Sequence, residues 1–148
     1  MSPSTNKRLA FAGLAAVLLV LPPAWGGEAD FQRIQDTIFT PHCVSCHSGF
    51  FAPHSLRLDA PNSYRSLVSM QSAEVPAFQR VKPSDPDASY LIQKVEGHAS
   101  EGVRMPASGP PLSRKDIELI RQWIAGGATA PGARSNYLTS DQAAREPK

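Results

Sequence analysis

The sequence has few cysteines, little excess charge and no long apolar segment. Two of its 148 residues are cysteines, and 15 basic side chains stand against 13 acidic ones. The small net charge and the absence of a basic stripe argue against a nucleic acid as partner. The length of the chain suits one small domain.

The longest apolar run lies near the N-terminus and is too short to cross a bilayer. Two basic residues precede 13 apolar residues at positions 9–21, whereas a membrane-spanning helix needs about 20. Two prolines end the run, and small residues up to Gly26 suit a signal peptidase. We therefore predict a secretory signal peptide at residues 1–26, in preference to an uncleaved anchor. The mature protein is then expected in the periplasm or otherwise exported, near neutral and without strong membrane association.

Both cysteines belong to one motif, Cys43-Val44-Ser45-Cys46-His47. Positions i, i+3 and i+4 of a helical turn share a face, so both thiols and the imidazole can point at one group. Cys-x-x-Cys-His is the attachment signature of a c-type haem, in which the thiols bind the porphyrin and His47 binds the iron. A disulfide and a thioredoxin-like centre are alternatives, but the latter needs a βαβ pattern that the sequence lacks. His42, directly before the motif, is expected to face water.

A second iron ligand is predicted in the segment 98–111. Its prolines and glycines exclude helix and strand, and a long irregular loop in a small domain is usually functional. Met105 lies at its centre, and a thioether is a soft iron ligand. We therefore predict Met105 as the distal ligand rather than as packing filler. Met70, His54 and His98 are the rival candidates.

Four helices are expected from apolar spacing and from residues that begin or end helices. The first covers residues 28–39 and should end at Thr40-Pro41, because a residue before proline avoids the helical region. The others are expected at 60–68, 86–97 and 113–125. Expected caps are Asp59, Asp85 and Ser113, the last with Asp116 in a capping box, and expected stops are Gly97 and Gly126.

Several side chains are assigned to the surroundings of the haem. Phe50 and Phe51 are expected to pack in the core, on the proximal side of the haem, which forms much of the core of so small a domain. The second ring nitrogen of His47 needs an acceptor, for which we predict the carbonyl of Pro53 or of a near neighbour. Tyr90 and Trp123 are expected in the core, with a hydrogen bond to a haem propionate as the alternative. Residues 69–83 are predicted to form a long loop at the surface or the haem edge.

These features together resemble the small class-I-type cytochromes c, and more narrowly the cytochrome c modules of planctomycete-type and other bacterial exported proteins. The matching segments are Ile38-Phe39, the motif, Leu56–Asp59, Pro83–Leu91, Arg104–Pro106, Pro110–Ser113 and Ile120–Ile124. The resemblance implies an all-α domain of four to five short helices at residues 27–127 around one covalently attached haem c. It also implies thioether bonds to Cys43 and Cys46, with iron bound by His47 and Met105. Residues 128–148 are predicted to be a flexible tail.

Three functions are weighed for this site. The first, which the resemblance implies, is periplasmic one-electron transfer between redox partner proteins by a carrier that is not an enzyme. The second is a haem subunit of a larger oxidoreductase, or a small peroxidase-like enzyme within one, which needs an open distal site. The third is a thiol redox protein that uses Cys43 and Cys46 without haem.

Overall fold

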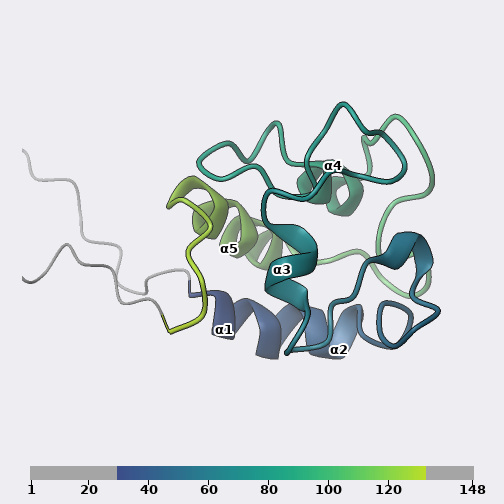
Figure 1. The fold of residues 1–148 in the computed structure, drawn as a ribbon, viewed down its shortest axis with the longest axis horizontal. Helices are drawn as coiled ribbons and strands as arrows, with labels where there is room; N and C mark the ends of the chain where they lie inside the picture. Colours follow the sequence, from purple (N-terminus) through teal and green to yellow (C-terminus); the bar gives the residue numbers. More distant parts are fainter. Residues whose placement is uncertain (1–29, 133–148) are drawn as a thin grey trace, which may run out of the picture.

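The structure, a computed structural model, describes residues 30–132 (Figure 1). These residues form helices and irregular loops, and their only β pairing consists of three isolated bridges. The predicted all-α architecture is therefore confirmed for this part of the chain. The predicted signal peptide, residues 1–26, lies outside the described residues, as does most of the predicted tail, residues 133–148. Within the described part, no helix has the length and apolar character needed to cross a membrane.

The first helical run is longer than the sequence predicted. α1 (Phe31–Ile34) continues through a π-helical turn (Gln35–Phe39) into α2 (Thr40–His42). The expected end at Thr40-Pro41 is therefore wrong. A proline ring usually clashes with the carbonyl group four residues earlier in a helix. The π-helical turn is wider, because its N–H groups bond carbonyls five residues earlier, and this gives Pro41 room.

α3 (Ser63–Leu67) and α4 (Tyr90–Glu96) begin later than predicted. Asp59 and Asp85, the expected caps, each hold a turn that precedes the helix. The Asp59 backbone carbonyl accepts the N–H group four residues on at 2.9 Å, and the Asp85 carboxylate accepts the N–H group three residues on at 3.1 Å. These turns occupy the residues that the sequence pattern assigned to first helical turns.

The predicted stop of α4 and the predicted start of α5 (Arg114–Ala125) are confirmed. Gly97 follows α4 with a φ of 85°, in the left-handed region that favours glycine. Ser113 caps α5 by accepting the Asp116 N–H group at 3.2 Å, and its hydroxyl donates to the Asp116 carboxylate at 2.7 Å. These two hydrogen bonds fix where the last loop ends and α5 begins, although the reciprocal bond of a full capping box, from the Ser113 N–H group to the Asp116 side chain, is not among the hydrogen bonds of the described residues.

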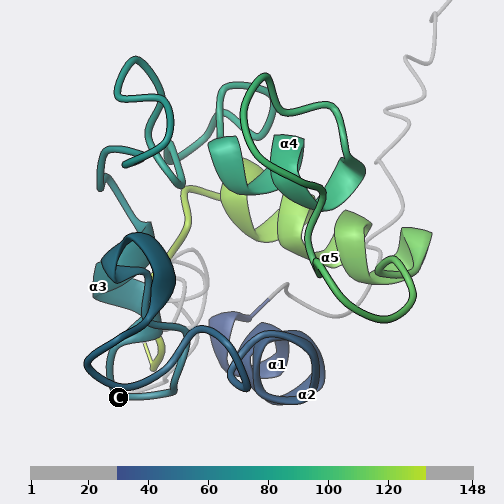
Figure 2. The same ribbon diagram turned by 90° about the vertical axis from the view of Figure 1, so that its right-hand side faces the viewer.

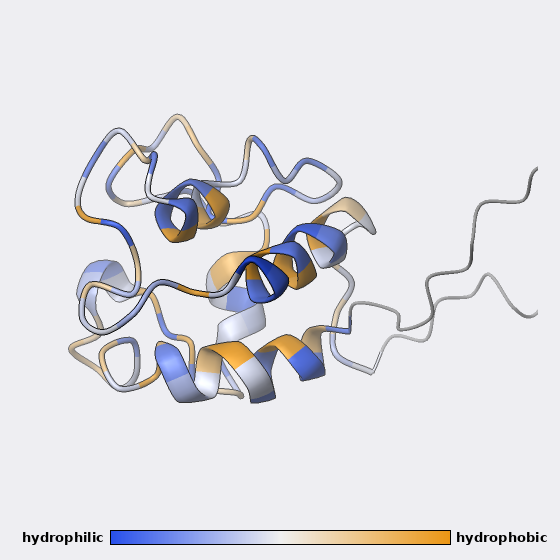
Figure 3. Cartoon of the chain, turned by 180° about the vertical axis from the view of Figure 1, so that it is seen from behind, coloured by the Kyte–Doolittle hydropathy of each residue, from blue (hydrophilic) through white to orange (hydrophobic). Residues whose placement is uncertain are grey.

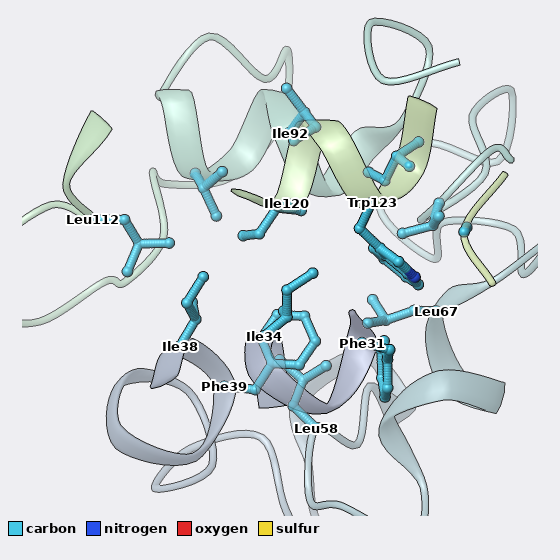
Figure 4. Close-up of a cluster of buried hydrophobic side chains, with 14 residues drawn as sticks. Phe31, Ile34, Ile38, Phe39, Leu58, Leu67, Ile92, Leu112, Ile120 and Trp123 are labelled. Carbon is cyan, nitrogen blue, oxygen red and sulfur yellow. The ribbon is translucent and has the colours of Figure 1, made fainter. Parts of the chain in front are cut away.

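The core lies where α5 packs between the N-terminal helical run and α4 (Figures 1 and 2). Apolar residues gather on the side of the N-terminal run that faces the rest of the domain (Figure 3). Figure 4 shows Ile34 and Ile38 of this run opposite Ile120 of α5. The rings of Phe31 and Trp123 lie 5.1 Å apart between their centroids. Each fully buried side chain of this kind stabilises the fold by about 1.5–3 kcal/mol.

The packed part of the chain extends past Gly127 into the segment predicted as a tail. Ala128 is buried, and its carbonyl accepts the Tyr64 hydroxyl at 3.0 Å. The indole N–H group of Trp123 donates to the Thr129 carbonyl at 3.0 Å. Trp123 is therefore a core residue, as predicted, and its N–H group has a backbone acceptor instead of a propionate.

Residues 69–83 form an irregular loop, as predicted, and the loop returns to the core at its end. Val81 is fully buried and pairs with Val68 in an isolated bridge. The Arg80 guanidinium donates to the Ser66 carbonyl at 2.8 Å. These contacts hold the loop against the end of α3.

Candidate functional site

The described residues surround a cavity of about 320 Å³, within the range of small-molecule and cofactor sites. Most of the wall is apolar. It includes residues from the end of the N-terminal helical run, from α4, and from the loop that crosses from α4 to α5. The apolar lining consists of Ile38, Phe39, Leu56, Leu58, Leu67, Leu91, Val95, Leu112 and Ile120, together with alanines and prolines.

The Cys-x-x-Cys-His motif forms one wall of this cavity. Cys43, Cys46 and His47 all line it. The motif is a tight turn in which the N–H groups of Cys46 and His47 both donate to the Cys43 carbonyl, at 3.2 and 2.9 Å. Both cysteines are free thiols, with Cys43 half-buried and Cys46 exposed. The turn thus brings two thiols and an imidazole to one wall, as the spacing predicted.

The imidazole of His47 is held by a backbone carbonyl at one of its two ring nitrogens, Nδ1. Its Nδ1 atom lies 3.2 Å from the carbonyl oxygen of Leu56. An Nδ1–H group that donates there leaves the Nε2 lone pair available to a metal. Burial lowers the pKa of His47, which favours the neutral ring that a metal ligand requires.

The acceptor for His47 is Leu56, three residues beyond Pro53, whereas the prediction was the carbonyl of Pro53 or of a near neighbour. Residues 53–55 form a 3-10 turn, in which the Pro53 carbonyl accepts the Leu56 N–H group at 3.0 Å. The Pro53 carbonyl therefore already has a donor, and the carbonyl of Leu56, the residue that follows the turn, reaches the imidazole. The sequence shows proline here but not which carbonyl the turn leaves free.

Met105 lines the same cavity as the motif and packs half-buried against the core. Its N–H group donates to the Lys94 carbonyl at 2.9 Å, and its bond to Pro106 is cis. The structure therefore brings together all four residues that the sequence singled out, although a long stretch of chain separates Met105 from the motif.

The rival ligands differ in their access to the cavity. Met70 is 46% exposed and is not among the lining residues. His98 is also outside the lining, with its Nδ1 atom 3.6 Å from the Glu96 carboxylate. His54 does line the cavity, and its Nε2 atom lies 3.8 Å from the Glu74 carboxylate. His42 is exposed, as predicted, and reaches the rim of the cavity.

Charged side chains in the cavity wall were missed by the sequence analysis. Glu74, Arg80 and Lys94 all line the cavity, and burial lowers the pKa of Arg80. Lys94 is buried, with its amine 3.0 Å from a Glu74 carboxylate oxygen. Its spacing from Tyr90 on the helix places it on the apolar face, which is the signal that could have identified it.

The prediction that Phe50 and Phe51 pack in the core is wrong. These side chains are 93% and 92% exposed, and neither lines the cavity. Their rings contact each other edge to face, with centroids 5.3 Å apart. Gly49 has a φ of 70°, a left-handed conformation open to glycine, and the turn there directs the next two residues into solvent.

The prediction that Tyr90 is a core residue is confirmed. The side chain is buried and forms part of the cavity wall. Its hydroxyl donates to the Glu101 carbonyl at 3.0 Å. The hydroxyl therefore has a backbone partner in the loop that follows α4, and it is not directed at a propionate.

The donor set of the cavity fits a c-type haem. Two thiols on one turn, an imidazole with one nitrogen free, a thioether and an apolar wall are what such a group requires. Among residues 30–132, no cluster of three or more His, Cys, Asp or Glu side chains could hold a metal ion directly. Comparisons of the chain with protein-family models, with curated proteins and with solved structures found no match. What this cavity can do therefore follows from its own residues.

Proposed function

We propose that this protein is an exported c-type cytochrome with one haem, and that it transfers single electrons between partner proteins in the periplasm. One observation carries the proposal. Cys43, Cys46, His47 and Met105 line a single, largely apolar cavity. A haem bound there supplies an iron centre that gains and loses one electron.

Each of the four residues has a defined task. Cys43 and Cys46 would each add a thiol across one porphyrin vinyl group, with the sulfur bonding to one carbon and the proton going to the other. His47 offers Nε2 to the iron, while the Leu56 carbonyl holds Nδ1–H and makes the ring a better donor. Met105 offers a soft sulfur, which favours the ferrous state and raises the reduction potential.

A carrier fits the cavity better than an enzyme does. If His47 and Met105 both bound the iron of a haem, no open position would remain for a substrate, and both ligands would stay in place when an electron is gained or lost. The largely apolar wall would also limit the access of water to an iron held there. The polar side chains of the wall already have partners, since Lys94 and His54 both face Glu74 and the Arg80 guanidinium donates to the Ser66 and His54 carbonyls.

His54 and Glu74 also favour a second candidate, because an imidazole and a carboxylate line the cavity. This candidate is a small peroxidase-like haem enzyme, or a haem subunit, within a larger oxidoreductase. A peroxidase-like reaction needs an open distal position and a nearby base. If Met105 were displaced from the iron, the open position would favour this second candidate.

The third candidate, a thiol redox centre, is disfavoured by the surroundings of Cys43. Burial, and then the proximity of Cys46, raise the pKa of the Cys43 thiol to about 11. Thiol–disulfide exchange proceeds through the thiolate, which is scarce at neutral pH for such a thiol. Addition to a vinyl group yields a thioether that no longer titrates.

The test is a visible spectrum of the full chain, produced with cytochrome maturation machinery. Acidic acetone should leave the colour on the protein, and the ferric form should show the weak charge-transfer band of sulfur ligation. Met105→Ala should abolish that band, whereas the matched variant Met70→Ala should keep it. Absence of covalent haem would overturn the proposal, and ready binding of carbon monoxide to the unmodified protein would favour the enzyme.

A further inference from the structure

A buried ion pair between α4 and the loop 69–83 lies in the cavity wall. The Lys94 amine is 3.0 and 3.1 Å from the two carboxylate oxygens of Glu74. The two side chains are only 7% and 20% exposed. Lysine is rarely buried unless its charge is paired, and a buried pair adds little net stability while removal of one partner is costly. The pair therefore calls for an explanation other than general stability.

The loop that follows α4 folds back onto this pair. The Lys94 amine also donates to the Glu101 carbonyl at 3.2 Å, the same carbonyl that accepts the Tyr90 hydroxyl. The next residue, Gly102, packs directly against the ion pair, because a Cβ atom there would lie 2.5 Å from the Lys94 amine. Its φ of 71° also favours glycine. The backbone of residues 101–102 thus packs closely against the Lys94 amine and the Glu74 carboxylate.

Lys94 makes a second hydrogen bond to the same loop, at Met105, the predicted iron ligand. Its backbone carbonyl accepts the Met105 N–H group at 2.9 Å. The side chain of Lys94 therefore attaches residue 101, and its backbone attaches residue 105. Met105 cannot move far from α4 while both attachments hold. Met105 is thus anchored to the helix that forms the cavity wall, even though it lies in an irregular loop.

We propose that Lys94 and Glu74 are positioning residues for Met105. The ion pair holds the loop that carries the thioether, and it thereby opposes loss of the sulfur from the iron. This inference rests on the proposed function, since it requires Met105 to bind the iron. It differs from a role in folding alone, because it concerns the detachment of one ligand from an otherwise folded domain.

The test compares Lys94→Met and Glu74→Gln with Lys82→Met in the full, haem-loaded protein. Lys82 is a matched control, because it pairs with Asp85 at 2.8 Å on the surface, where the two side chains are 52% and 40% exposed. Each protein is heated while the sulfur-to-iron band and the far-ultraviolet helix signal are recorded. Imidazole, which replaces the sulfur, is then titrated at 25 °C.

The expected result separates positioning from folding. In both site variants the band should be lost well below the temperature at which helix is lost, and imidazole should bind about tenfold more tightly than to the unmodified protein. The control should bind imidazole as the unmodified protein does, and the interval between loss of the band and loss of helix should be the same in both. If the band and the helix signal fall together and imidazole affinity is unchanged, the pair is structural only and the inference is wrong. Should Lys94→Met not fold, Glu74→Gln decides.

The failure of the proposed function would look different. In that case the unmodified protein itself would lack the sulfur-to-iron band, whatever the variants do. If the unmodified protein has the band and the site variants behave as Lys82→Met does, the inference fails and the proposed function stands.

Discussion

The Nδ1 atom of His47 faces the carbonyl oxygen of Leu56 at 3.2 Å, across nine residues of chain. A second hydrogen bond joins the same two segments, because the Leu58 N–H group donates to the His47 carbonyl at 2.7 Å. The imidazole is therefore oriented by main-chain groups, which side-chain substitutions do not remove. Of the two proposed iron ligands, His47 is the one held by its own ring contacts, and Met105 is the one held through its loop.

Met105→Ala should therefore open one axial position and leave the other intact. We expect attached haem, loss of the sulfur-to-iron band, a lower reduction potential, and imidazole binding tighter by about tenfold or more. Spectroscopic titration and potentiometry measure these changes. An unchanged potential in Met105→Ala would show that the sulfur does not bind the iron.

Ile120→Ala should lower the free energy of unfolding by about 2–5 kcal/mol, as for other buried large-to-small substitutions. Ile120 is fully buried, belongs to the core and lines the cavity. Denaturant unfolding of the haem-loaded protein measures the loss. Lys115→Ala, on the exposed face of the same helix, should change stability by no more than about 0.5 kcal/mol. Equal effects of the two substitutions would contradict the packing described for α5.

Phe50→Ser and Phe51→Ser should each change stability by no more than about 0.5 kcal/mol. Both rings are almost fully exposed, so little apolar area is buried on folding. The yield of attached haem should also be unchanged, because neither residue lines the cavity. Unfolding curves and haem content check this result, and a loss of about 3–5 kcal/mol, typical of a buried phenylalanine, would place these rings in the core after all.

Asp59 should make the stability of the domain depend on pH in the acidic range. The Asn62 side-chain amide and then the Arg57 guanidinium hold the pKa of Asp59 below its ordinary value of 3.8. A carboxyl group with a lowered pKa in the folded state contributes stability above its unfolded value, and this stability is lost as the pH falls through the folded value.

The unmodified protein should therefore be more stable than Asp59→Asn above pH 3.8, and the difference should shrink as the pH falls below it. Thermal unfolding between pH 2 and pH 7 measures both proteins. Asp85→Asn should behave in the same way, because the Lys82 amine lowers the pKa of Asp85. A difference that does not vary with pH would mean that these carboxylates are equally acidic in the unfolded chain.

Features set by local spacing could be predicted from the sequence. The turn of the motif, the stop at Gly97 and the N-cap at Ser113 each depend on residues within one helical turn of each other. The position of Met105 in the same cavity was predicted for a different reason, because it lies at the centre of a long irregular loop, which is usually functional in a small domain, and because its thioether is a soft iron ligand.

Features set by the exact path of the backbone could not be predicted. The acceptor of His47 depends on which carbonyl a 3-10 turn leaves free, and the exposure of Phe50 depends on the turn at Gly49. Lys94 was overlooked because a charged residue on a helix is usually solvated. Its burial becomes understandable only when Glu74, from a loop without periodicity, is found beside it.

The π-helical turn at Gln35–Phe39 determines the direction around the helix axis in which the residues after it point. Each residue of an α-helix advances about 100° around the axis, so one extra residue within a turn rotates everything after it by a comparable angle. Ile34 lies before this turn and Cys43 follows it. Ile34 can therefore point toward α5 while the thiol of Cys43 points toward the cavity. An uninterrupted α-helix would give these two side chains a different relative direction. Removal of one residue from 35–39 would rotate the thiols relative to the apolar side chains that pack against α5, although every residue of the motif would remain.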